Sequence, residues 1–288
     1  MFSTTKQSGF FGMPRLKRLG IYLTLIAATS PFVVRGLEPY LTHHPYAFDG
    51  NKDWELPANA EEIWFTTADN VKLNAWFLHA PQPSKGTVLY SHGNGGNLTF
   101  VRGVAQDLVQ HGLDVLIYDY RGYGRSEGSI PSEEEMYADG DAAYEFLTKT
   151  RGIQAEKLAI YGLSLGTTVS TDVASRRPCG ALVLEAPLSS ASDMANVMLP
   201  ILPRALHWIG KNKFESERKI SSVKCPVLIA HGDADEMIPT EQGRKVFAAA
   251  NEPKKLLIVP NGHHWLPETN GYLNSVSEFI VSSLARNN

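Results

Sequence analysis

Six short apolar runs recur along the chain, each separated from the next by a stretch that is long enough for a helix. They lie at 87–90, 115–118, 158–161, 181–184, 226–230 and 255–259. Strands that alternate with helices in this way form parallel sheets, because each intervening helix returns the chain to the same edge of the sheet. Helices then cover both faces. The pattern therefore predicts an α/β fold with a mostly parallel sheet.

An antiparallel hairpin is expected before the first of these runs. The segments 61–66 and 71–78 alternate apolar and polar residues on either side of Ala68-Asp69-Asn70, which is typical of a hairpin. Among the helices, Ser132 followed by Glu135 has the capping-box pattern of a helix start. Helices are expected at 98–110, 132–149, 165–175, 240–250 and 271–285.

One serine lies at the junction between an apolar run and an expected helix. The sequence there is Gly162-Leu163-Ser164-Leu165-Gly166. A serine in a sharp strand-to-helix turn has a strained backbone, and side chains two residues before and after it would collide. Glycines at both places remove the collision, so the pattern predicts a nucleophile elbow with Ser164 as the nucleophile. The N–H of Leu165, at the positive end of the helix dipole, would face an oxyanion.

A glycine-rich turn follows the first apolar run. It reads Ser91-His-Gly-Asn-Gly-Gly-Asn97, and its glycines let the backbone bend toward the expected elbow. We expect the N–H of Asn94 to be the second oxyanion donor. A phosphate cradle is the alternative, but the spacing matches neither a dinucleotide fingerprint nor a Walker loop with its lysine.

Candidates for an acid and a base follow the last two runs, where the carboxyl ends of parallel strands gather catalytic groups. Asp233 and Asp235 lie in the first of these turns, and His263 and His264 lie in the second. We prefer His263 as the base because it directly follows Gly262, with His264 as the alternative.

Composition and motif content exclude several other classes. The net charge is −3 with lysines and arginines scattered among acidic residues, so no positive field favours nucleic acid. The sequence contains no His-Glu-x-x-His and no clustered Cys/His ligands, so we expect no metal and no cofactor. Cys179 and Cys225 are too few for a disulfide framework, and each is interpreted as a small apolar residue at the start of a strand.

Taken together, the motifs resemble those of serine hydrolases of the α/β-hydrolase type, in particular membrane-anchored bacterial members described as esterases or peptidases. The resemblance also rests on Asp119-Tyr-Arg-Gly-Tyr-Gly-Arg-Ser126 and His231-Gly-Asp-Ala-Asp235, and it extends from about residue 61 to the C-terminus. It implies an α/β-hydrolase fold, and the chain order Ser, Asp, His is the order of that family. The roles it implies are Ser164 as nucleophile, Asp235 as orienting acid, His263 as general base, and Asn94 and Leu165 as oxyanion donors.

The expected activity is cleavage of an ester, thioester or amide bond through an acyl-enzyme intermediate. A carboxylesterase or lipid-acyl hydrolase with a small-molecule or lipid-like acyl substrate is preferred. A serine peptidase or aminopeptidase of the same fold is the first alternative. A non-catalytic receptor or scaffold is the second, since fold does not dictate function. The oligomeric state is not predicted.

The N-terminal part of the chain predicts a membrane location. Residues 19–34 carry no charge and follow the basic residues Lys6, Arg15, Lys17 and Arg18. We expect an uncleaved anchor over 1–36 with the enzyme domain outside the cytoplasm; a cleaved signal peptide and a helix packed on the domain are the alternatives. A linker follows at 37–60 and the catalytic domain at 61–288. The apolar stretch 189–222 is interpreted as a small lid, with extra core helix as the alternative.

Overall fold

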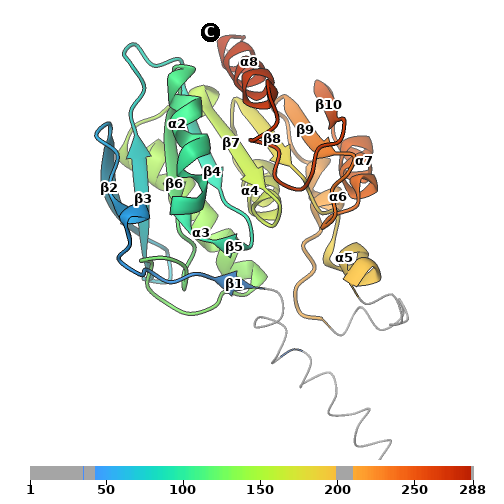
Figure 1. The fold of residues 1–288 in the computed structure, drawn as a ribbon, viewed down its shortest axis with the longest axis horizontal. Coiled ribbons are helices and arrows are strands. Elements are labelled where there is room, and N and C mark those ends of the chain that lie inside the picture. The colour runs from blue at the N-terminus through green and yellow to red at the C-terminus, as the bar shows by residue number, and fades with distance from the viewer. Residues whose placement is uncertain (1–34, 36–42, 199–209, 287–288) are drawn as a thin grey trace, which may run out of the picture.

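The structure is a computed structural model that describes residues 35, 43–198 and 210–286 of the 288 in the chain (Figure 1). Its strands are β1 His44–Pro45, β2 Ala60–Thr66, β3 Lys72–Leu78, β4 Thr87–Ser91, β5 Gly95–Gly96, β6 Asp114–Tyr118, β7 Leu158–Leu163, β8 Ala181–Glu185, β9 Val227–Gly232 and β10 Lys254–Val259. Its α-helices are α2 Arg102–Gln110, α3 Glu133–Glu145, α4 Gly166–Arg176, α5 Ala191–Met198, α6 Ser216–Ile220, α7 Thr240–Ala249 and α8 Tyr272–Ala285. Short helical turns are η2 Lys52–Trp54, η3 Leu98–Val101, η4 Phe146–Thr150 and η5 Ala155–Lys157.

An eight-stranded sheet forms the centre of the molecule, with the strand order β10-β9-β8-β7-β4-β6-β3-β2. The six strands from β10 to β6 are mutually parallel, whereas β3 pairs antiparallel with both β6 and β2. The β2–β3 hairpin turns through Asn70, whose φ of 65° lies in the left-handed region that asparagine tolerates. These pairings confirm the predicted α/β class, the mostly parallel sheet and the N-terminal hairpin at its edge.

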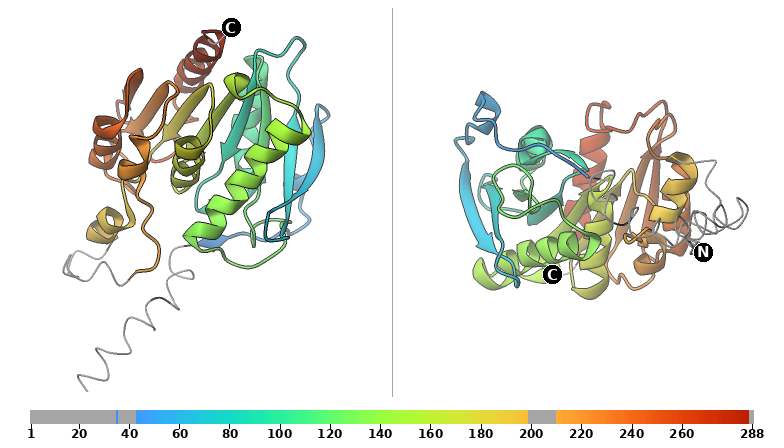
Figure 2. Two further views of the ribbon diagram at one scale, coloured as in Figure 1. Left: turned by 180° about the vertical axis from the view of Figure 1, so that it is seen from behind. Right: turned by 90° about the horizontal axis from the view of Figure 1, so that it is seen from below.

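Two apolar clusters lie on the two faces of this sheet. Successive residues of a strand point to opposite faces, and in β7 Leu158 and Ile160 belong to one cluster while Ala159 and Tyr161 belong to the other. The first cluster packs against α3, α4, α6 and α7, and the second against α2 and α8. Figure 1 shows α2 and α8 in front of the sheet, and the view from behind in Figure 2 shows α3 and α4. Helices therefore cover both faces, as predicted.

The predicted helix start at Ser132 is present. The hydroxyl of Ser132 accepts the N–H of Glu135 at 3.4 Å, and the Glu135 carboxylate accepts the N–H of Ser132 at 2.7 Å. This reciprocal capping satisfies two donors that a helix otherwise leaves unpaired. The helix continues from α3 into the π-helical turn η4, so the predicted range 132–149 covers α3 and all but the last residue of η4.

Several additional segments lie at the end of the sheet where the parallel strands terminate. β1, from the predicted linker, pairs with β5 in the turn after β4. The insertion between β8 and β9 contributes α5 and α6, and residues 199–209, including Trp208 of the predicted lid, lie outside the described residues. Figure 1 shows β1, β5 and α5 at the lower end of the sheet. The catalytic motifs are expected at this end.

The expected membrane-anchored, extracytoplasmic location has to be corrected. A single helical span needs about 20 consecutive, mainly apolar residues. Within 43–198 and 210–286, and at residue 35, no helix combines the length and apolar character that crossing a bilayer requires. The stretch 19–34, on which the expectation rested, falls outside the described residues. The structure thus offers no support for a membrane span.

Candidate active site

Ser164 occupies a sharp turn between the end of β7 and the start of α4. Its φ is 52°, a left-handed conformation that costs a non-glycine residue about 1–3 kcal/mol and is concentrated at functional sites. A Cβ on Gly162 would lie 2.6 Å from the carbonyl oxygen of Gly166, and a Cβ on Gly166 would lie 2.1 Å from that of Ser91. The two glycines therefore permit the turn, for the steric reason that the sequence suggested.

The backbone around Ser164 is held by its neighbours. The N–H of Ser164 donates to the carbonyl oxygen of Glu185 at the end of β8, over 2.8 Å. The Ser164 carbonyl accepts the N–H of Thr167 at 2.9 Å in the first turn of α4. A Cβ built on Gly93 would lie 3.5 Å from that of Ser164. The glycine-rich turn after β4 is thus directly adjacent to the serine.

The two expected oxyanion donors lie on either side of this contact. Leu165 precedes α4, and Asn94 follows Gly93 in the turn. Among the described residues, neither backbone N–H has a hydrogen-bond acceptor. The Asn94 side chain is otherwise engaged: its Oδ1 accepts the N–H of His44 at 3.1 Å and the hydroxyl of Tyr123 at 3.3 Å. Backbone donors without internal partners are the groups from which an oxyanion hole is built.

The turn that carries Asn94 is fixed by a buried carboxyl group. Asp119 Oδ1 accepts the N–H of Leu98 at 2.6 Å, and the hydroxyl of Tyr120 donates to the carbonyl oxygen of His92 at 2.9 Å. Burial raises the pKa of Asp119 to about 7, against the opposing effect of the N–H groups of Leu98 and Arg125. The sequence motif around Asp119 therefore organises the loop.

Arg121 from the same motif is also committed to holding the loop. Its guanidinium donates to Asp139 at 2.7 and 2.9 Å and to Asp69 at 2.6 and 3.1 Å. The side chain of Arg121 is buried, and two carboxylates occupy its planar donor face. These contacts fit a structural role better than a clamp for a substrate carboxylate.

Asp235 lies in the turn after β9 and contacts a histidine, but that histidine is His264. The Nδ1 atom of His264 lies 2.9 and 3.1 Å from the two carboxylate oxygens of Asp235. The ring of His263 points elsewhere: its Nδ1 lies 3.2 Å from Oε2 of Glu236, and both side chains are exposed. The structure thus joins Asp235 to the alternative histidine and not to the preferred one. Adjacent residues in an extended turn point in different directions, so only one can face the acid.

The carboxylate of Asp235 is buried and heavily hydrogen-bonded. Oδ1 accepts the N–H groups of Met237 at 2.8 Å and Ile238 at 2.9 Å, and Oδ2 lies 3.2 Å from Nε2 of His231. Burial alone would raise the pKa of Asp235, but the hydrogen bonds from His231, His264 and Ile238 outweigh it and hold the pKa well below its ordinary value. Asp235 is therefore a carboxylate, the form that can orient an imidazole and balance its charge.

Two residues that the sequence did not place in the site touch its components. His231, at the end of β9, is fully buried against Asp235, and its Nε2 also lies 2.8 Å from the carbonyl oxygen of Ile238. Glu185, at the end of β8, holds the Ser164 N–H through its main chain. Both follow apolar runs at the sheet edge where catalytic groups gather, and that position is the signal by which they could have been found.

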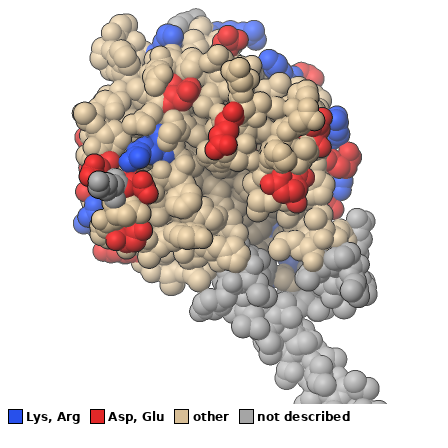
Figure 3. Space-filling model, viewed as in Figure 1, with Lys and Arg blue, Asp and Glu red and all other residues tan. Residues whose placement is uncertain are grey.

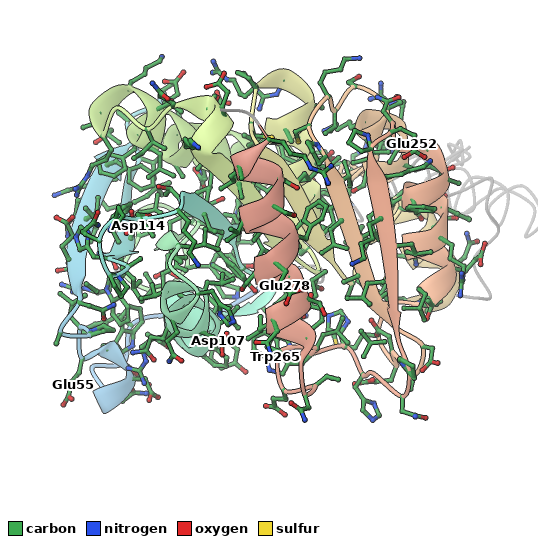
Figure 4. The ribbon with its side chains drawn as sticks, turned by 90° about the horizontal axis from the view of Figure 1, so that it is seen from above. Glu55, Asp107, Asp114, Glu252, Trp265 and Glu278 are labelled. Carbon is green, nitrogen blue, oxygen red and sulfur yellow. The ribbon has the colours of Figure 1, made fainter. Side chains whose placement is uncertain are left out.

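Exposed apolar side chains surround this end of the sheet. Val197 and Met198 of α5 are 43% and 66% exposed, Met237 next to Asp235 is 58% exposed, and Phe100 after the glycine-rich turn is 60% exposed. Figure 3 looks onto the face with α2 and α8, where the surface is mostly uncharged toward its lower edge and charged residues lie mainly above and to the sides. In Figure 4, Trp265 lies beside α8, consistent with its packing against the cluster beneath that helix. An apolar substrate portion would find compatible surface here.

No metal centre is evident near these groups. Within the described ranges, no set of three or more His, Cys, Asp or Glu side chains is arranged so that it could hold a metal ion.

Comparison with known proteins places the chain among hydrolases. Residues 82–219 match the family model described as serine aminopeptidase, S33. The uncharacterized protein YfhR of Salmonella typhi is 30% identical over 264 residues, covering 85% of this chain and 89% of that protein. The mouse alpha/beta hydrolase domain-containing protein 17C is 33% identical over 241 residues, covering 81% of this chain and 72% of that protein.

Solved structures with the same architecture include two lipid or ester hydrolases. An esterase of Pyrococcus furiosus matches with a TM-score of 0.66 at 20% identity, over 85% of this chain and 97% of that one. A monoacylglycerol lipase of Paleococcus ferrophilus matches with a TM-score of 0.58 at 20% identity, over 73% of this chain and 99% of that one. At such identities the likeness establishes the fold alone.

Proposed function

The chain belongs to the α/β-hydrolase family and has its fold, and on that premise we propose that it is a serine hydrolase that cleaves carboxylic esters. Ser164 is the nucleophile, His264 the general base and Asp235 the orienting acid. The observation that carries the proposal is the buried Asp235–His264 pair, located at the same sheet edge as the strained turn at Ser164. His264 replaces His263, which the sequence favoured, because only His264 contacts the acid.

The reaction follows from the roles of these groups. Asp235 accepts the Nδ1–H of His264, which leaves Nε2 as the basic nitrogen of the ring. His264 Nε2 takes the proton from Ser164 Oγ as the oxygen attacks the substrate carbonyl, and the resulting oxyanion is bound by the N–H groups of Asn94 and Leu165. The imidazolium then protonates the leaving alcohol. Water releases the acyl group in a second half-reaction with the same proton transfers.

An ester with an apolar acyl group is the proposed substrate class. The exposed side chains of Val197, Met198, Met237 and Phe100 support it, since they supply apolar surface around the site. Two structural neighbours are named an esterase and a monoacylglycerol lipase, and both names denote enzymes that cleave ester bonds. Aminopeptidase activity is the second candidate, and the description of the matching family model favours it.

A substrate panel with a matched pair of variants tests the proposal. The purified chain is assayed against p-nitrophenyl esters from acetate to decanoate and against aminoacyl p-nitroanilides. We expect ester turnover that rises with acyl length and that is lost in Ser164→Ala. The control is Ser282→Ala, which removes an exposed hydroxyl on α8. Ester hydrolysis that persists in Ser164→Ala would refute the nucleophile, and turnover of the anilides alone would favour the peptidase.

A further inference from the structure

Glu185 is a buried acid that contacts two parts of the candidate site from one position. It is the last residue of β8, and its register partner across the sheet is Leu163, the residue before Ser164. Its main-chain carbonyl accepts the Ser164 N–H at 2.8 Å. Through its main chain, Glu185 therefore supports the strained turn that presents the serine.

The side chain of Glu185 reaches the loop that carries His264. It is fully buried, and its Oε1 accepts the N–H of Leu266, two residues after His264, at 3.1 Å. The other oxygen, Oε2, accepts the hydroxyl of Tyr161 on β7. Because Leu266 is itself buried, this hydrogen bond anchors the loop to the sheet at a defined place.

The groups that face Glu185 come from three elements and the loop. Tyr161 on β7 and Tyr272 on α8 contact each other through their hydroxyls at 3.1 Å, and Tyr90 on β4 lies nearby with a hydroxyl that has no hydrogen-bond partner among the described residues. Burial raises the pKa of Glu185 to about 7; the Tyr161 hydroxyl, the Leu266 N–H, the Tyr272 hydroxyl and positive charge on His264 oppose that rise. The carboxylate is thus within electrostatic reach of the imidazole.

We propose that Glu185 is a positioning residue of the hydrolase: it fixes the His264 loop relative to Ser164 and supports the positive charge that His264 acquires during the reaction. The inference rests on the proposed function. It goes beyond it because Glu185 is not one of the proposed triad residues Ser164, His264 and Asp235. A shift of about 1 Å in a catalytic group can cost about 100-fold in rate. A single hydrogen bond that fixes the position of the His264 loop is therefore expected to affect the reaction rate.

Two substitutions separate the hydrogen bond from the charge. Glu185→Gln keeps an oxygen that can accept the Leu266 N–H and an amide that can donate to Tyr161, but it removes the negative charge. Glu185→Ala removes both. Tyr90→Phe is the matched control, since it alters a neighbouring buried side chain without touching the loop.

The readout is the second-order rate of labelling by a fluorophosphonate probe between pH 5 and 9, which needs no knowledge of the substrate. We expect Glu185→Ala to label about 10- to 100-fold more slowly and Glu185→Gln to recover most of that loss. Glu185 with a pKa of about 7 is only partly ionised on the acid limb, but its ionised fraction favours the imidazolium, so in Glu185→Gln the midpoint of that limb should move to lower pH. Tyr90→Phe should match the wild type in rate and midpoint. A merely structural acid would leave the midpoint unchanged.

The outcomes distinguish this inference from the proposed function. If the wild type labels and Ser164→Ala does not, the function stands. Glu185 variants that then match the wild type in rate and midpoint would overturn the positioning role alone. If Glu185→Ala does not fold, the acid-limb midpoint of Glu185→Gln tests the positioning role: an unchanged midpoint would overturn it. If the wild type itself does not label, the proposed function has failed.

Discussion

The two adjacent histidines after β10 provide a direct prediction, because the structure gives them different partners. We consider His264→Ala and His263→Ala, which remove the same side chain from neighbouring positions. The side chain of His264 is 14% exposed and lies 2.9 Å from Asp235, whereas the side chain of His263 is 73% exposed and contacts Glu236, which is 60% exposed. The comparison therefore separates the general base from a surface residue.

The expected magnitudes follow from these environments. Loss of a general base costs about 10²- to 10⁴-fold in rate, and His264→Ala also leaves the buried Asp235 carboxylate without its imidazole. We expect a loss of at least about 10³-fold in kcat/KM, which corresponds to about 4 kcal/mol of transition-state stabilisation. An ion pair as exposed as His263–Glu236 contributes little, so His263→Ala should change kcat/KM by less than about threefold.

The assay is hydrolysis of a short p-nitrophenyl ester at pH 8 by both variants and the wild type, with circular dichroism to check that each variant is folded. Stability is compared by urea unfolding at the same pH. A loss in His263→Ala as large as that in His264→Ala, or full activity in His264→Ala, would refute the assignment of the base. It would also show that the contact with Asp235 does not select the catalytic imidazole.

Three further predictions concern the acid, the elbow and the buried carboxyl. Asp235→Asn should lower kcat about 10⁴-fold by analogy with other triads, as measured with the same ester; near wild-type turnover would contradict it. Gly166→Ala should destabilise the fold by about 2–4 kcal/mol in urea unfolding, because its Cβ would approach the Ser91 carbonyl to 2.1 Å, whereas Gly103→Ala in the open face of α2 should be neutral or stabilising. The pKa of Glu185 is raised from 4.5 to about 7, so its contribution to stability is full below pH 4.5 and is lost as pH rises through 7. The unfolding free energy of the wild type should therefore fall between pH 4 and 8, and in Glu185→Gln that fall should be smaller by about 3 kcal/mol. An equal fall in both proteins would contradict the raised pKa of Glu185.

Much of the fold was predictable because short apolar runs alternate with helix-length stretches along the chain. Each buried strand is a short apolar run, and the hairpin and the capping box have local sequence signatures, so the sheet, its hairpin edge and the start of α3 follow from the sequence. The elbow at Ser164 was predictable because Gly162 and Gly166 flank it in the sequence. A Cβ on Gly162 would meet Gly166, whereas a Cβ on Gly166 would meet Ser91 on β4, a contact that the sequence did not indicate.

The catalytic base could not be chosen in the same way. His263 and His264 follow the same glycine, and which ring faces Asp235 depends on the path of the loop from Val259 to Tyr272, which tertiary contacts determine. One such contact is the N–H of Leu266 on the Glu185 side chain. The sequence could not supply it, because the two residues are far apart in the chain.

The roles of two buried polar residues in the site were also not predicted from the sequence. His231 and Glu185 directly follow apolar residues of their strands, and their roles depend on neighbours from other elements. A charged or polar residue at the carboxyl end of a buried strand is costly unless it is paired, so its presence there indicates a partner. Only the structure identifies which residue that partner is.

The role of Ser164 as nucleophile is tested by treating the wild-type chain with a fluorophosphonate, digesting it and locating the adduct by mass spectrometry. We predict one adduct per chain, on the Ser164 hydroxyl in the peptide that spans the end of β7 and the start of α4. Modification at another residue, or no modification of the folded chain, would show that Ser164 is not the nucleophile.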